Sequence, residues 1–205
     1  MLNLDAESWH SASALSIHAE STFAPQSLST RLNAEDEVML KTITADSFLQ
    51  SDFRPMVDSR GQPYPYESWI ALVKRTGTLP SSVPEPIANA FEICVGTIIY
   101  AWLYWPLLAI GFEKLLMLRE MLARSACQKY GATESQTKNY VDCITYLVAN
   151  GHISASQKEA WDIGRKMRNA SAHPEKASLY LPWHAELMLE TFVADATLLF
   201  PSSTT

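Results

Sequence analysis

The chain has 205 residues, of which 47% are hydrophobic and 19% charged, and its formal net charge is −6. This length supports one or two domains built around a sizeable hydrophobic core. The acidic balance excludes a surface coated with basic charge for non-specific nucleic-acid binding, although it leaves room for a local basic site.

Residues 1–80 predict an irregular N-terminal arm, because they are rich in small polar residues and have weak hydrophobic periodicity. One short helix is expected near residues 35–49, and a second short apolar helix over Tyr66–Lys74. Prolines within residues 77–86 predict a linker. We therefore place the domain boundary near residue 80 and a helical bundle over residues 81–205.

Ile87–Arg124 predicts a long apolar helix, and residues 93–112 within it carry no charged side chain. A run of this length is long enough to span a bilayer. However, its flanking charges are acidic, no cluster of basic residues precedes it, and Pro106 interrupts it. A helix that is apolar on all sides also suits the centre of a bundle. We expect a buried central helix and no membrane span, with a membrane-spanning helix as the alternative.

Three further helices are expected after the long one. Thr133–Gln136 has the spacing of a capping box, and it precedes an apolar stripe over residues 140–148. Ser154–Gln157 has the same spacing and begins a helix that runs to about His173. A last amphipathic helix follows Pro182. The predicted class is all-α, an up-and-down bundle of four to five helices with an irregular N-terminal arm.

The cysteines and histidines show no spacing typical of a metal site. Because the three cysteines are far apart in the sequence, we expect reduced, buried thiols in a cytoplasmic protein. The five histidines lack the spacings of zinc-binding motifs, so no metal and no other cofactor is expected. The N-terminus has no basic segment followed by an apolar run, so no secretory signal is expected.

A cluster of cations with a histidine stands at the end of the helix that is predicted to stop before Pro174. On an ideal helix Arg165, Arg168, Asn169 and His173 lie opposite the apolar arc. Arg168 and His173 are five residues apart, so about 140° separates their side chains. They can meet at one atom if the last turn is distorted, or if a second copy of the helix packs alongside. We favour the second option, a two-fold dimer.

This group of residues suits chemistry on a phosphodiester. A guanidinium holds phosphate oxygens in a bidentate manner, and an imidazole moves a proton at neutral pH. An RNA 2′-hydroxyl could then attack the adjacent phosphorus while arginine stabilises the extra negative charge. The spacing of Arg168 and His173 alone is a weak signal, and on spacing alone a solvated helix end with a histidine near its negative pole is favoured.

The segment from Ile153 to Pro174 resembles the HEPN superfamily (higher eukaryotes and prokaryotes nucleotide-binding). The hallmark of that superfamily is an arginine followed by a histidine after four to six residues, often with a polar residue directly after the arginine. Here these residues are Arg168, His173 and Asn169. The resemblance covers about residues 87–200.

The resemblance implies an all-α bundle that dimerises and, in many members, cleaves RNA without a metal ion. Such members act as toxins, in anti-phage defence or in RNA processing. Carried over to this chain, Arg168 and His173 are the catalytic pair, Asn169 is a polar helper and Glu113 an acidic helper. We add Arg165 on its helical position alone.

The partners that the resemblance implies are RNA, a second copy of the chain, and an antitoxin or other regulatory protein. The alternative function is a non-catalytic interaction or nucleotide-binding module of the same fold, acting as a dimeric scaffold.

Overall fold

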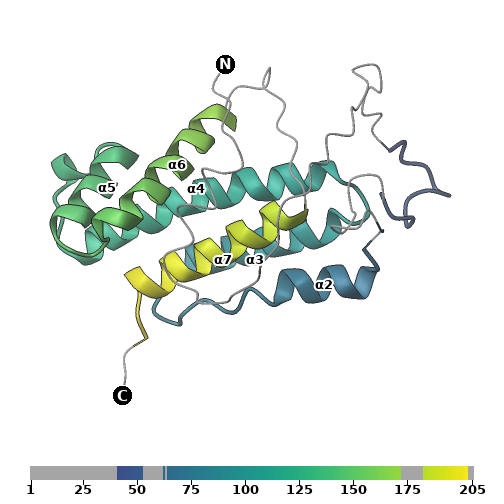
Figure 1. Cartoon of the computed structure of the whole chain (residues 1–205), viewed down its shortest axis with the longest axis horizontal. Coiled ribbons are helices and arrows are strands. Elements are labelled where there is room, and N and C mark those ends of the chain that lie inside the picture. The colour runs from purple at the N-terminus through teal and green to yellow at the C-terminus, as the bar shows by residue number, and fades with distance from the viewer. Residues whose placement is uncertain (1–40, 53–61, 63, 172–181, 203–205) are drawn as a thin grey trace, which may run out of the picture.

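The computed structural model describes residues 41–52, 62, 64–171 and 182–202 (Figure 1). Within these residues all regular structure is helical, which confirms the all-α class predicted from the sequence. The described residues form six α-helices and one short 3-10 helix: α2 (Tyr66–Lys74), α3 (Glu85–Tyr100), α4 (Pro106–Lys129), η1 (Glu134–Gln136), α5 (Tyr140–Ala149), α6 (Ala155–Ser171) and α7 (Pro182–Leu199).

The helix predicted over Ile87–Arg124 is in fact two helices. The first, α3, ends at Tyr100, and α4 begins at Pro106 after a short turn. Proline suits the first turn of a helix, where its missing N–H has no partner to lose, but not the interior. The chain therefore reverses direction, and α3 and α4 pack side by side (Figure 1). No helix in the described ranges has both the length and the apolar character needed to cross a bilayer.

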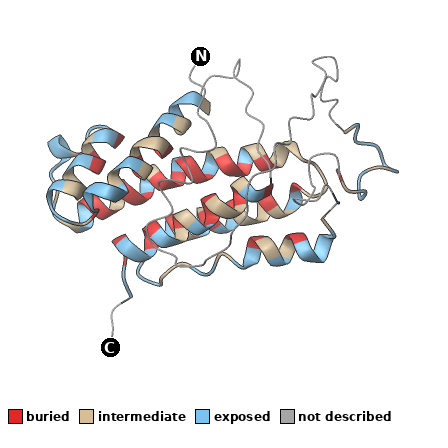
Figure 2. Ribbon diagram, in the orientation of Figure 1, coloured by how far each residue is buried: buried red, intermediate tan, exposed pale blue. Residues whose placement is uncertain are grey.

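Helix α4 lies at the centre of the fold and contacts α3, α5, α6 and α7. Buried residues recur along this helix from Leu108 to Cys127, and they are red in Figure 2. On one side of it α3 and α7 meet through Phe91 and Phe192, whose rings stack with centroids 5.1 Å apart. This arrangement leaves another side of α4 for α5 and α6.

Helix α2 has the bounds predicted from the sequence, and it shares the central core. Trp69 is fully buried, and its indole N–H donates to the carbonyl oxygens of Ile98 and Ile99, each at 3.1 Å. The domain boundary near residue 80 stays a prediction. Of the helix predicted near residues 35–49, residues 41–49 form coil and turns, and the remainder lies outside the described residues.

The two predicted capping boxes have different outcomes. The Ser154 box is confirmed at the start of α6, where the Ser154 N–H donates to Gln157 Oε1 at 2.9 Å and the Gln157 N–H donates to Ser154 Oγ at 3.2 Å. The Thr133 box also forms, but it caps only η1. Helix α5 starts later, at Tyr140, with a box of its own made by Asn139 and Asp142. The predicted extension of α6 to His173 lies outside the described residues.

The three cysteines, Cys94, Cys127 and Cys143, are buried and not joined in disulfides, in agreement with the expected buried thiols. Burial raises the pKa of the Cys94 thiol to about 11, so this side chain stays protonated at neutral pH.

Gly111 of α4 packs against Ile98 of α3, and this contact gives a stability prediction. A Cβ atom at position 111 would lie 2.6 Å from Cγ1 of Ile98, which is fully buried. Gly111→Ala is therefore expected to lower the free energy of unfolding by about 1–2 kcal/mol, because overpacking outweighs the gain in helix propensity.

Gly96 of α3 is the matched control, because a Cβ atom there meets nothing within 4 Å. Gly96→Ala is expected to raise the free energy of unfolding by up to about 1 kcal/mol. Urea unfolding of both variants tests the contact, and a Gly111→Ala variant as stable as Gly96→Ala would contradict it.

Candidate functional site

Helix α6 is fixed to α4 through a buried arginine. Arg119 is only 1% exposed, and its Nε donates to Asp195 Oδ2 of α7 at 2.6 Å. Its Nη1 donates to the Ala160 carbonyl oxygen of α6 at 3.0 Å, and its guanidinium lies 4.3 Å from the ring centroid of Trp161. Gly164 leaves the space that this guanidinium fills, since a Cβ there would lie 2.5 Å from Arg119 Nη1. These contacts set which face of α6 turns toward α4.

Arg119 and Asp195 stabilise each other's charged form in the interior. Burial raises the pKa of the Asp195 carboxyl above its ordinary value of 3.8, while the charge and hydrogen bond of Arg119 oppose that rise. The pair joins α4, α6 and α7 at one point, so it holds the surface of α6 in a fixed position beside α5.

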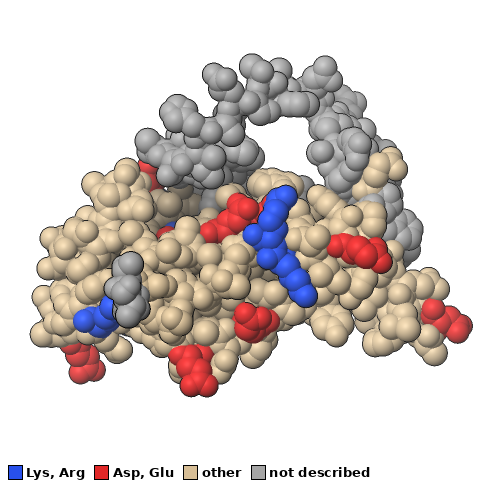
Figure 3. Space-filling view, turned by 90° about the horizontal axis from the view of Figure 1, so that it is seen from below, with Lys and Arg blue, Asp and Glu red and all other residues tan. Residues whose placement is uncertain are grey.

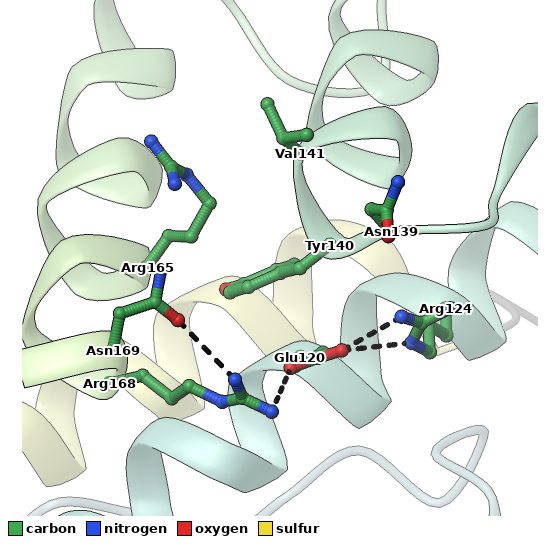
Figure 4. Close-up of a pocket in the computed structure, with 8 residues that line it drawn as sticks. All are labelled: Glu120, Arg124, Asn139, Tyr140, Val141, Arg165, Arg168 and Asn169. Carbon is green, nitrogen blue, oxygen red and sulfur yellow. Dashed lines mark hydrogen bonds and ion pairs between the residues drawn. The ribbon is translucent and has the colours of Figure 1, made fainter. Parts of the chain in front are cut away.

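A pocket of about 360 Å³ lies between α4, the start of α5 and the second half of α6 (Figure 4). Each of the three helices supplies polar side chains to its lining. The lining residues are Glu120 and Arg124 from α4, Asn139, Tyr140 and Val141 at the start of α5, and Arg165, Arg168 and Asn169 from α6.

The Glu120 carboxylate binds two guanidinium groups in this pocket (Figure 4). Its Oε1 accepts from Arg124 Nε at 3.1 Å and from Arg124 Nη2 at 2.8 Å, while its Oε2 lies 3.2 Å from Arg168 Nη2. Arg168 Nη1 also donates to Asn169 Oδ1 at 3.3 Å. One carboxylate therefore holds both guanidinium groups in defined orientations.

Arg165 stands on the same side of α6, one turn before Arg168. Its Nε lies 3.4 Å from Asp162 Oδ1. Burial alone would raise the pKa of the Asp162 carboxyl, but hydrogen bonds and charges from Lys158 and Arg165 hold it below its ordinary value. Asp162 thus stays ionised and orients Arg165 without belonging to the pocket lining.

The lining carries more positive than negative charge, with three arginines against one glutamate. The side chains of Arg124, Arg165 and Arg168 are 37%, 27% and 41% exposed, so a ligand can reach them. By contrast, the described residues on the face seen in Figure 3 show scattered acidic and basic side chains and no extended basic patch. The pocket is a local cationic site on a chain whose net charge is −6.

Tyr140 lies in the lining between α5 and α6, and its hydroxyl is unusual. The residue is 7% exposed, and its ring packs edge-on against Trp161 with centroids 6.4 Å apart. Its hydroxyl is buried and has no hydrogen-bond partner among the described residues. Burial raises the pKa of this hydroxyl, against a smaller opposing effect of Arg119, so it stays protonated and able to donate.

Three of the residues predicted from the sequence, Arg165, Arg168 and Asn169, meet in this pocket. Glu113 does not line it, and the acidic group in contact with Arg168 is Glu120, two helical turns further along α4. His173 lies outside the described residues, so its pairing with Arg168 stays a prediction.

Sequence reasoning missed Glu120 and Tyr140 as site residues. Glu120 and Arg124 are four residues apart, a spacing that predicts an ion pair on one helix face, but it does not indicate that α6 packs beside them. Tyr140 fitted an ordinary apolar stripe, and nothing in the sequence distinguishes its unpaired hydroxyl from one that is hydrogen-bonded. Comparison of the chain with protein-family models, with curated proteins and with solved structures found no match.

Proposed function

We propose that this protein is a metal-independent endoribonuclease of the HEPN type, in which Arg168 and His173 act on a phosphodiester of RNA. The observation that best supports this proposal is the position of Arg168 in the pocket lining. The arginine of the sequence motif lines a surface pocket beside two further arginines, with 41% of its side chain exposed. A surface arginine with only a structural role has no need of a concave, cationic surrounding.

In the proposed reaction His173 removes the proton from an RNA 2′-hydroxyl, whose oxygen then attacks the adjacent phosphorus. The bond from phosphorus to the 5′-oxygen breaks, and that oxygen takes up a proton. The products are a 2′,3′-cyclic phosphate and a 5′-hydroxyl. Arg168 donates to the non-bridging oxygens, where negative charge grows in the transition state. Glu120 orients this guanidinium through its Oε2, which lies 3.2 Å from Arg168 Nη2.

We also propose that two copies of the chain pair through α6. The five-residue separation of Arg168 and His173 turns them apart on one ideal helix, and a two-fold axis can bring the arginine of one copy to the histidine of the other. Such a dimer would be a helical bundle of the HEPN kind. Its cellular role would be that of a cytoplasmic toxin or defence component controlled by a regulatory protein.

A second candidate function is a non-catalytic interaction or nucleotide-binding module. The ion pairs favour it, because each of the three arginines of the pocket already has a carboxylate partner, Glu120 or Asp162. An ionic network of this kind can hold helices together without chemistry. This candidate predicts binding of a partner or nucleotide without cleavage.

The test is cleavage of a single-stranded RNA by the full chain in the presence of a metal chelator. The RNA is compared with a strand of the same sequence in which the sensitive linkage carries a 2′-deoxyribose. We expect the RNA to be cut and the 2′-deoxy linkage to stay intact, because only the ribose supplies the nucleophile. Cleavage that needs a divalent metal ion, or equal cleavage of both strands, would overturn the proposal.

A further inference from the structure

We infer that the pocket between α4, α5 and α6 is a phosphate-binding site, in which the Tyr140 hydroxyl and the guanidinium group of Arg165 hold the phosphate next to the one that is cleaved. The inference rests on the proposed function for its ligand, a single-stranded RNA. Its physical basis is the pocket itself.

The unpaired Tyr140 hydroxyl is the first argument. A buried hydroxyl without a partner costs free energy, and nearly all buried polar groups in folded proteins are hydrogen-bonded. Tyr140 is 7% exposed, and its hydroxyl has no partner in the described part of the chain. In Figure 4 the hydroxyl end of the ring points from α5 toward α6, on the side of Arg165 and Asn169. A ligand that supplies an acceptor oxygen would satisfy it.

The chemistry of the lining is the second argument. Its side chains are mostly donors: three guanidinium groups, the two asparagine amides and the phenolic hydroxyl, against the single carboxylate of Glu120. The ligand must therefore bring negative charge and several acceptor oxygens, as a phosphate group does. Val141 at the rim is 42% exposed and offers apolar surface to the attached ribose or base.

The size of the pocket is the third argument. Its volume of about 360 Å³ is enough for a small ligand such as a nucleotide unit. The Tyr140 hydroxyl is shielded from solvent in the free protein, so side chains of the pocket lining must move before a phosphate oxygen reaches it. The Arg165 side chain is 27% exposed, so it has room to move.

Tyr140→Phe provides the sharpest test, because it removes only the hydroxyl. Binding is measured by isothermal titration calorimetry with inorganic phosphate and with an RNA trinucleotide whose 2′-oxygens are methylated, which cannot be cleaved. Loss of one hydrogen bond to a charged group is expected to weaken trinucleotide binding about 10- to 100-fold. The stability to urea should stay equal or rise, because no hydrogen bond within the described residues is lost.

Tyr146→Phe is the matched control. The Tyr146 hydroxyl donates to the Tyr130 carbonyl oxygen at 2.9 Å, and Tyr146 is not part of the pocket lining. This variant is expected to lose stability and to bind the trinucleotide as the wild type does.

A second pair of variants tests the arginine. Arg165→Gln should weaken binding of the trinucleotide. Arg75→Gln changes an exposed residue paired with Glu186 of α7, and it should leave that binding unchanged.

The outcomes separate this inference from the proposed function. A wild-type protein that cleaves RNA but binds the trinucleotide independently of Tyr140 overturns the phosphate site and leaves the nuclease. Tyr140-dependent binding without any cleavage supports the site and overturns the nuclease. Binding of inorganic phosphate as tight as that of the trinucleotide would mean that the site takes a free phosphate, which overturns the assignment to an RNA strand.

Discussion

Replacing Arg119 with alanine is expected to lower the free energy of unfolding by about 3–5 kcal/mol, because it leaves the Asp195 carboxylate buried without its partner. The same change removes the hydrogen bond to the Ala160 carbonyl oxygen and the stacking on Trp161. Arg119 joins α4, α6 and α7, so no other single polar side chain among the described residues is expected to matter as much for the position of α6. Urea denaturation at neutral pH measures the loss.

The decrease in the free energy of unfolding caused by Arg119→Ala should also depend on pH. Without Arg119, burial raises the pKa of Asp195 further above its ordinary value of 3.8. Between those two pKa values the folded variant binds a proton that the unfolded chain does not bind, so lowering the pH stabilises the folded variant. The difference in the free energy of unfolding between wild type and variant is therefore expected to shrink as the pH is lowered from neutral toward the ordinary carboxyl pKa of 3.8. A difference that stays constant would contradict a charged, buried Asp195.

Two controls distinguish the effect of breaking a buried ion pair from the effect of removing any positive charge. Arg75→Ala breaks the ion pair with Glu186, but the Arg75 side chain is 65% exposed, so the cost is expected to be about 1 kcal/mol at most. Replacing both partners of the buried pair, Arg119→Met with Asp195→Leu, should recover much of the loss, because no unpaired charge then remains.

Replacing Arg168 or His173 with alanine is expected to slow RNA cleavage by about 10²- to 10⁴-fold. Arg168 would stabilise the charge that develops on the phosphate, and His173 would transfer the proton. The fold should survive the change at Arg168, since its side chain is 41% exposed and its ion pair with Glu120 is near the surface. Single-turnover rates measured in a chelator, together with urea unfolding, test this prediction.

Lys166→Ala is the control for these variants, because Lys166 is an exposed cation on the same helix and does not line the pocket. Its cleavage rate should equal that of the wild type. Arg168→Lys should remain slow, since lysine keeps the charge but cannot form the bidentate fork. If Arg168→Ala and His173→Ala cut RNA as fast as Lys166→Ala, the catalytic pair is wrongly assigned.

The helices that could be predicted are those whose ends carry a local signal. The sequence alone predicted α2 over Tyr66–Lys74, the start of α6 from the Ser154 capping box, and α7 from Pro182. The turn between α3 and α4 was harder, because residues 93–112 are uncharged throughout and the reversal depends on how two apolar helices pack. A capping box also forms before η1, so this signal predicts a helical turn but not its length.

The site could be predicted only on the helix that carries the motif. Arg165, Arg168 and Asn169 lie on one face of α6, and helical periodicity places them together. Glu120 and Tyr140 come from α4 and α5, and their approach depends on tertiary packing around Arg119 and Gly164. A pattern within one helix contains no information on that packing. Glu113 was taken from the family resemblance, and Glu120 was not predicted as a site residue.

Mass spectrometry of the fragments that the full chain releases from single-stranded RNA in a chelator tests the central claim most directly. Attack by the neighbouring 2′-oxygen predicts fragments that end in a 2′,3′-cyclic phosphate and begin with a 5′-hydroxyl. Fragments with a 3′-hydroxyl and a 5′-phosphate would show that water or another external nucleophile attacks the phosphorus, which would contradict the roles given to Arg168 and His173.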